Sequence, residues 1–361
     1  MGSSSDQGWP RPVRRVVIKI GSGVVTVKDG PGLQIDRNVI FRTAVELAAL
    51  VQGGMEVIVV SSGAVALGLE ELALPAKPDV MSQVQATAAV GQSLLMQLWR
   101  EAFGRARIRV GQVLLTHSDL SDRQRFLNVR ATLDSLIAFG CVPVVNENDT
   151  VMTDEITVGD NDTLASQVAK LVGGDALMLL STVDGLLDAD GAVVPLVRLA
   201  DDPLALVSAA MSATGRGGMG SKVQAARAAA HGGIATFIAS GKKRGVIPAA
   251  LAGETVGTRF EHDERGLPSR KHWIAYTLKS KGAVTVDAGA ARAVVQAGAS
   301  LLPIGMTAVS GQFEAGDLVK VLDPEGVEVA RGLSKHSAVD LAAMVGKRGP
   351  PVIHRDDLVT R

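Results

Sequence analysis

Short runs of β-branched residues alternate along most of the chain with longer stretches in which apolar residues recur at helical spacing. The runs that predict strands are Val16–Ile20, Val57–Val60, Val110–Leu115, Val142–Val145, Ala176–Leu180 and Thr236–Ala239. The stretches that predict helices are Arg37–Gln52, Val80–Phe103, Asp122–Phe139, Thr163–Leu171, Pro203–Ala210 and Gly220–His231. Such alternation is typical of an α/β fold, in which a mainly parallel sheet carries helices on both faces.

The pattern changes after about residue 240, where charged residues, Gly and Pro become frequent. Shorter strand-like runs follow at Ala283–Val286, Leu318–Val321, Val327–Ala330 and Pro351–His354, with one predicted helix at Gly289–Gln296. We therefore expect a disordered tail over 1–12, a first domain over 13–265, a linker over 266–279 and a small β-rich domain over 280–361.

Composition limits the classes of protein to which the chain can belong. Of the 361 residues 47% are apolar, and 37 basic residues balance 37 acidic ones, so charge does not favour binding to nucleic acid or to an anionic membrane. No apolar stretch approaches the roughly 18 residues of a membrane span, and the N-terminus lacks the apolar core of a signal peptide. The single cysteine, Cys141, excludes an internal disulfide. We expect a cytoplasmic protein.

The segment Asn146–Thr163 (NENDTVMTDEITVGDNDT) is the strongest sign of chemistry. It holds six carboxylates and neither Lys nor Arg, and it follows a run that predicts a buried strand. Like charges about 4 Å apart repel by roughly 4 kcal/mol at a surface-like dielectric. Such a cluster indicates a cationic partner, although a solvated acidic loop would have the same composition. In open α/β sheets, sites lie at the carboxyl ends of strands.

Lys19 stands near the end of the first predicted strand, where a buried ammonium group is costly unless it meets an anion. The Gly21-Ser22-Gly23 turn that follows would let backbone N–H groups approach a phosphate closely. A lysine that extends to the surface is the alternative.

A glycine-rich segment, Gly215–Lys222, opens a predicted helix, where unpaired N–H groups favour phosphate. The match to GxGxxG is weak because a helix and not a strand precedes it, and Gly-Ser-Lys is not the Walker A order. Lys222 opposes the helix dipole in the first turn unless an anion is present. We expect one carboxylate of the acidic segment to orient Lys19 and Lys222.

No pattern of nucleophilic or metal-binding residues stands out. Ser62 is preceded by Val60 where a nucleophile elbow needs Gly, so we interpret it as a hydrogen-bond donor to a substrate, or as a plain turn serine. The six His residues have no metal-ligand spacing, and no protein metal site is predicted.

Taken together, these motifs resemble the amino acid kinase family, and within it the kinases that phosphorylate L-glutamate. The matching segments are KIGSG (19–23), VSSGAVALG (60–68), RQRFLN (123–128), VVNENDTV (144–151), EITVGDNDTLA (155–165) and GGMGSKVQAA (217–226). The last 80 or so residues resemble a PUA domain. The similarity runs from about Val13 to Arg361 and implies an amino acid kinase-like α/β/α sandwich with a PUA domain.

The resemblance also implies a reaction: phosphorylation of the side-chain carboxylate of L-glutamate by ATP with Mg²⁺, the first step of proline biosynthesis. It implies that Lys19, Lys222 and Asp162 are catalytic. Ser62, Asp149 and Asn161 would bind glutamate. ATP would contact Lys19, Ser181, Thr182, Arg216, Gly217, Gly218, Met219, Gly220, Ser221 and Lys222. Proline is implied as a feedback inhibitor, and a homodimer or homotetramer as the assembly.

Two alternatives remain at the level of the sequence. The substrate could be N-acetylglutamate or aspartate, although Asp149 suits a free ammonium group. The PUA-like tail could bind RNA, but residues 280–361 carry 9 basic and 9 acidic residues, and RNA binding normally needs a basic face. Ser181-Thr182 departs from the family pattern, in which Asp often takes the second position.

Overall fold

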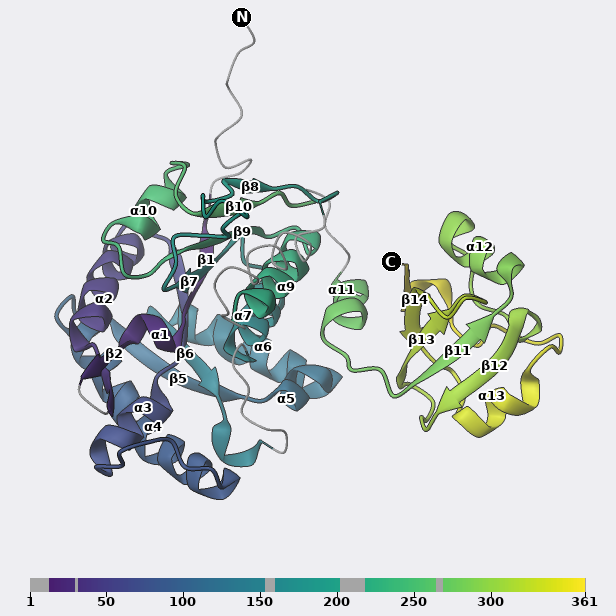
Figure 1. Cartoon of the computed structure of the whole chain (residues 1–361), viewed down its shortest axis with the longest axis horizontal. Helices are drawn as coiled ribbons and strands as arrows, with labels where there is room; N and C mark the ends of the chain where they lie inside the picture. Colours follow the sequence, from purple (N-terminus) through teal and green to yellow (C-terminus); the bar gives the residue numbers. More distant parts are fainter. Residues whose placement is uncertain (1–12, 30–31, 153–159, 202–217, 264–268, 361) are drawn as a thin grey trace, which may run out of the picture. The chain divides into compact units, whose positions relative to one another are not determined.

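The computed structural model describes residues 13–29, 32–152, 160–201, 218–263 and 269–360. Two compact units, residues 1–266 and 267–361, make up the chain and are described separately (Figure 1).

The first unit is built on one large sheet. Its strands are β1 (Arg15–Ile20), β4 (Glu56–Ser61), β5 (Arg109–Leu115), β6 (Cys141–Glu147), β7 (Ala176–Ser181), β8 (Leu196–Val197), β9 (Ala235–Ser240) and β10 (Thr258–Phe260). They lie in the order β5-β6-β4-β1-β7-β9-β10-β8. From β5 to β9 all neighbours are parallel, whereas β10 runs antiparallel to β9. The predicted mainly parallel α/β sheet is confirmed.

Helices occupy the connections between these strands. They are α1 (Ser22–Val25), α2 (Arg37–Gln52), α3 (Ala64–Glu71), α4 (Met81–Gly104), α5 (His117–Ser121), α6 (Arg123–Ala138), the 3₁₀ turn η1 (Asp149–Val151), α7 (Asp160–Leu171), α9 (Gly218–His231) and α10 (Val246–Leu251). A hairpin of β2 (Thr26–Asp29) and β3 (Gly32–Ile35), which the sequence did not predict, precedes α2. The predicted helix Pro203–Ala210 lies outside the described residues.

Alternation along β1 assigns its side chains to two faces of the sheet. Val16, Ile18 and Ile20 belong to a core that also contains residues of α2, α4 and α10, whereas Val17 does not. Lys19 has the parity of Val17 and points to the face covered by α7 and α9 (Figure 1). The charged end of β1 is therefore separated from the larger apolar core.

Close helix packing fixes the position of α4 against α3. A Cβ atom on Gly68 of α3 would stand 1.9 Å from the Thr87 carbonyl oxygen, and one on Gly91 of α4 would stand 1.8 Å from that of Ala64. Only glycine permits backbones to approach so closely. This contact brings the middle of α4 beside the residues that follow β4.

The second unit is a small sheet with its own core. Its strands are β11 (Gly282–Val286), β12 (Met306–Gly311), β13 (Leu318–Leu322), β14 (Glu328–Leu333) and β15 (Leu358–Thr360), in the order β12-β11-β13-β14-β15. Its helical elements are α11 (Ser269–Tyr276), α12 (Ala288–Ala297), the 3₁₀ turns η2 (Pro303–Gly305) and η3 (Arg355–Asp357), and α13 (Ala338–Met344).

Three features of this unit differ from the sequence prediction. Residues 351–354 form no strand, and only an isolated bridge joins Ile353 to Leu301. The strands β12 and β15 and the helix α13 were not predicted. The segment expected as a linker contains α11, whose Ile274 is buried against Leu318 and Val359. This helix therefore packs within the second unit.

Candidate active site

Two lysines share one buried carboxylate at the carboxyl edge of the large sheet. Lys19 Nζ lies 2.5 Å from Asp162 Oδ1, and Lys222 Nζ lies 2.9 Å from Asp162 Oδ2. Asp162 is 0% exposed, Lys19 4% and Lys222 12%. The cluster carries two positive charges and one negative charge, so it keeps a net charge of about +1 that an anionic ligand can neutralise.

The three members come from separate elements. Lys19 is the penultimate residue of β1, Asp162 lies in the first turn of α7, and Lys222 lies one turn into α9, where its Nζ also donates to the Gly218 carbonyl at 3.2 Å. Both helices cover the face of the sheet to which Lys19 points. The predicted orientation of two lysines by one carboxylate matches this geometry.

Burial dominates the electrostatics of Lys19. Loss of hydration lowers the pKa of its ammonium group below the usual range, the Asp162 carboxylate raises it, and the Lys222 charge lowers it. Lys19 thus holds its proton less tightly than a free lysine. An arriving anion would stabilise the charged form.

Consecutive serines at the end of β4 have different surroundings. Ser61 accepts a hydrogen bond from the buried Trp99 indole at 2.9 Å and so packs toward α4. Ser62 points to the opposite face, where its Oγ accepts from Asn161 Nδ2 at 3.0 Å. Of the two, Ser62 faces the site.

A chain of side-chain amides extends the site from α7 toward α4. Asn161 Nδ2 also donates to Asn146 Oδ1 at 3.2 Å, and Asn146 Nδ2 donates to Gln92 Oε1 at 2.7 Å. The sequence alone does not mark Asn146 or Gln92 as a site residue. Asn146 stands within the acidic segment that drew attention, whereas no sequence signal marks Gln92, whose place depends on the packing of α3 and α4.

Asp149 opens the 3₁₀ turn η1 directly after β6 and is partly buried. This turn is joined to α4 by a hydrogen bond from Gln85 Nε2 to the Met152 carbonyl at 2.8 Å. Asp149 therefore lies at the same strand end as Asn146. Asp154 and Glu155 of the acidic segment fall outside the described residues.

Residues predicted for ATP flank the end of β1 on its other side. The Gly21 amide donates to the Leu180 carbonyl at 3.3 Å, and a Cβ on Gly23 would stand 3.0 Å from Thr182 Cγ2. This contact places the Gly21–Gly23 turn against Ser181 and Thr182. Gly218, Met219 and Gly220 form the first turn of α9, and Ser221 Oγ donates to the Gly218 carbonyl at 3.1 Å. Arg216 and Gly217 lie outside the described residues.

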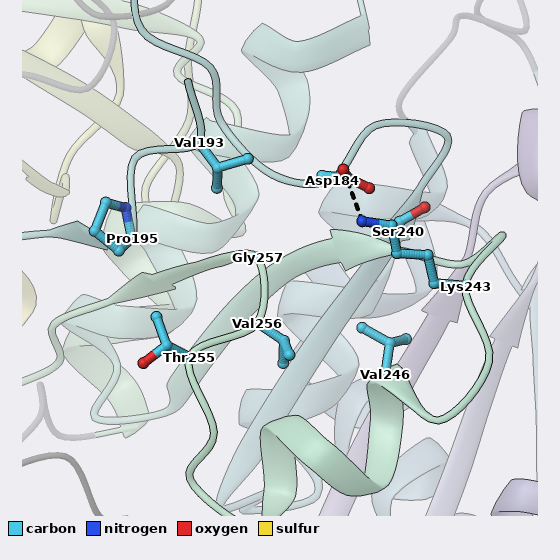
Figure 2. A pocket seen from close by; sticks show the side chains of 9 residues that line it. All are labelled: Asp184, Val193, Pro195, Ser240, Lys243, Val246, Thr255, Val256 and Gly257. Carbon is cyan, nitrogen blue, oxygen red and sulfur yellow. Dashed lines mark ion pairs between the residues drawn. The ribbon is translucent and has the colours of Figure 1, made fainter. Parts of the chain in front are cut away.

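A pocket of about 300 Å³ lies one strand further along the sheet edge (Figure 2). Ser240, one of its lining residues, pairs with Ser181 in the β7–β9 register. Val193, Val246 and Val256 make its walls largely apolar. The Lys243–Asp184 ion pair, 2.8 Å long, borders it. Among the described residues predicted for ATP, none lines this pocket, but Ser181 pairs with its lining residue Ser240, so the pocket adjoins that group.

The described residues contain no cluster of three or more His, Cys, Asp or Glu side chains arranged to hold a metal ion. Asp162, the buried carboxylate of the site, is already neutralised by two lysines. Mg²⁺ that arrives with a nucleotide needs no such cluster, because that ion is usually held by phosphates and water with one or two carboxylates.

The chain is similar to known proteins over nearly its whole length. Residues 14–240 match the model of the amino acid kinase family, and residues 282–355 match that of the PUA domain. The chain belongs to the amino acid kinase family. A glutamate 5-kinase from Pseudomonas putida is 44% identical over 96% of this chain and 97% of its own length. One from Chromohalobacter salexigens is 46% identical over 97% and 96%.

Solved structures support the amino acid kinase fold. Carbamate kinase from Giardia lamblia aligns with a TM-score of 0.50 at 19% identity, and another structure of Giardia carbamate kinase aligns with a TM-score of 0.52 at 20% identity. The alignments cover 70% of this chain and 99% and 100% of the carbamate kinase chains. None of the helices in the described part of this amino acid kinase combines the length and apolar character that a bilayer crossing requires.

Proposed function

We propose that this chain transfers the γ-phosphoryl group of ATP to the side-chain carboxylate of L-glutamate, forming L-glutamyl 5-phosphate, with Lys19, Lys222 and Asp162 as the catalytic group. Full-length similarity to proteins named glutamate 5-kinase supports the reaction. The observation that carries the residue roles is the buried pair of lysines on one carboxylate.

The proposed reaction requires no general base. A glutamate side chain is ionised at neutral pH, since its reference pKa is about 4.3, and it can attack the phosphorus directly. The barrier then depends on alignment and on neutralising the charge that spreads over the transferred group. Lys19 and Lys222 provide two ammonium groups for that task, and Asp162 holds both of them in position.

ATP is the phosphoryl donor, and its Mg²⁺ neutralises phosphate charge. The Gly21–Gly23 turn, Ser181, Thr182 and the segment from Arg216 to Lys222 form the proposed nucleotide site. N–H groups in the first turn of α9 favour the phosphates, since they carry the positive end of the helix dipole.

Glutamate lies on the other side of β1 in this proposal. Ser62 follows β4, and Asp149 opens η1 after β6, the strand next to β4 in the sheet. Asn161 in the first turn of α7 donates hydrogen bonds to Ser62 and to Asn146 of β6. Asp149 pairs with the α-ammonium group, and the Ser62 hydroxyl donates to the substrate. Proline, which also carries an α-carboxylate and a positively charged α-nitrogen, would compete for this site as an inhibitor.

We further propose that the enzyme works in the cytoplasm as a homodimer or homotetramer, and that the PUA domain serves assembly or regulation. The single cysteine, Cys141, is a free thiol, which a reducing compartment would preserve.

The experiment is to measure ATP consumption by the purified protein with Mg²⁺, comparing L-glutamate, N-acetyl-L-glutamate and L-aspartate. Turnover with L-glutamate alone, trapped as the hydroxamate, is the expected result. Turnover with a different acid would support the phosphoryl transfer but contradict the roles proposed for Ser62, Asp149 and Asn161 in binding glutamate.

A further inference from the structure

The chain of amides beside the catalytic lysines has a fixed direction. The backbone N–H of Glu147 donates to Asn146 Oδ1 at 2.9 Å, and a backbone amide can only donate. Asn146 Oδ1 is therefore an acceptor and its Nδ2 a donor. It follows that Gln92 presents Oε1 to Asn146, and that Asn161 presents Nδ2 to it.

With the hydrogen bonds in this direction, one side-chain amide atom at each end of the chain of amides has no partner within it. Gln92 Nε2 and Asn161 Oδ1 are buried and have no hydrogen-bond partner within the described part of the chain. Buried polar atoms are rarely left without a partner unless a ligand or water supplies one. One end therefore offers N–H donors and the other an acceptor.

Their positions run away from the lysines along the sheet edge. Lys19 is the penultimate residue of β1, Ser62 follows β4 and Asn146 is the penultimate residue of β6, and these strands are consecutive neighbours. With strands about 4.8 Å apart, β6 lies roughly 10 Å from β1. An extended amino acid with its side-chain carboxylate at the lysines would direct its α-groups toward Asn161 and Gln92.

We propose that Gln92 is a specificity-determining residue that donates a hydrogen bond from Nε2 to the α-carboxylate of L-glutamate. The proposal rests on the function proposed above. In this arrangement the Asn161 Oδ1 acceptor faces the α-ammonium group together with Asp149. Asn146 keeps both amides in register, and the glycine contact between α3 and α4 holds Gln92 at the site.

The test exchanges donor and acceptor on both molecules. Gln92→Glu keeps an oxygen for Asn146 Nδ2 but replaces the free N–H₂ with a carboxylate oxygen. L-isoglutamine has an amide in place of the α-carboxylate and retains the reactive side-chain carboxylate. We expect Gln92→Glu to lower kcat/KM for L-glutamate by about 100-fold and to lower that for L-isoglutamine far less.

The readout is the ratio of the two kcat/KM values in one preparation, because the fraction of folded enzyme cancels in it. Where L-isoglutamine turns over too slowly, its inhibition constant against L-glutamate replaces its kcat/KM. The control is Gln97→Glu, which makes the same charge change at an exposed position of α4 and should leave the ratio unchanged.

A Gln92→Glu ratio within about twofold of that of the unsubstituted enzyme would overturn the assignment. A rise in the KM for ATP as large as the rise in the KM for L-glutamate would also overturn it, since that would indicate a general disturbance of the site. Absence of glutamate-dependent turnover in the unsubstituted enzyme would instead refute the proposed function.

Discussion

Gly91 of α4 faces Ala64 of α3 so closely that a methyl group on Gly91 would stand 1.8 Å from the Ala64 carbonyl oxygen. The obstacle is backbone, which cannot rotate aside as a side chain can. This contact sets the distance between the two helices and thereby the position of Gln92, the next residue along α4.

We predict that Gly91→Ala destabilises the first unit by about 3 kcal/mol, because the two helices must separate. Gly104→Ala is the matched control, since a Cβ at that end of the same helix meets nothing within 4 Å. It should leave stability unchanged or raise it by up to about 1 kcal/mol. Chemical denaturation measures both, and equal effects would show that the contact does not limit packing.

We predict that Lys222→Ala lowers kcat by about 100- to 1,000-fold with little change in the KM for glutamate, because the lysine acts on charge that develops during transfer. Asp149→Ala should do the reverse, raising that KM by about 10- to 100-fold, since it removes the partner of the α-ammonium group. Steady-state kinetics separates the two. Small and equal changes in both constants would remove these roles.

We predict that activity falls with rising pH earlier than a free lysine would require. Burial lowers the pKa of Lys19, and only its charged form can neutralise phosphate. The contribution of Lys19 to the free energy of unfolding changes in the opposite direction. As pH rises, the folded state loses the Lys19 proton before the unfolded chain does. Between the lowered pKa and the ordinary pKa, stability from this group therefore increases with pH. Parallel pH profiles of kcat/KM, which reports groups of the free enzyme, and of thermal unfolding should therefore diverge.

We predict that Asp162→Asn shifts the alkaline fall in residual activity to lower pH. The carboxylate raises the pKa of Lys19, so its removal lowers that pKa further. The two lysines would also repel each other without it, and loss of one partner from a buried ion pair typically costs about 3–5 kcal/mol. An unchanged pH profile with normal folding would mean that Asp162 does not control Lys19.

We predict that a truncated first unit is more soluble when the chain is cut before α11 than when it is cut after α11. A chain that ends at Lys279 retains Ile274 without Leu318 and Val359, against which it is buried. That chain should aggregate more readily than one that ends at Gly266. Light scattering and sedimentation of the two truncated proteins provide the comparison, and equal solubility would show that α11 needs no partner in the second unit.

The sequence predicted the central strands well because strands buried on both faces are continuous apolar runs, as in Ala176–Leu180. It missed β12, where most residues are exposed or partly exposed, and it mistook residues 351–354 for a strand. An apolar pattern does not separate an edge strand from an extended segment that makes a single bridge.

The same contrast holds for the site. Lys19, Ser62, Asp162 and Lys222 stand in motifs beside strand ends or helix starts, so the fold class alone indicates that they gather. Gln92 stands in the middle of a long helix, and its position in the apolar–polar pattern of that helix is the same as that of solvent-exposed residues. The approach of α3 to α4 at Gly68 and Gly91 helps to bring it to Asn146.

Strand β1 stands between β4 and β7, so it divides the edge of the sheet into two halves. The proposed glutamate contacts follow β4 and β6 on one half, and Ser181 ends β7 on the other, while Lys19 alone belongs to β1. In the proposed arrangement, substitutions beyond β4 would change which acid is accepted without altering affinity for the nucleotide. This division lets one phosphoryl-transfer centre be adapted to new acceptors by changes confined to a single half of the sheet.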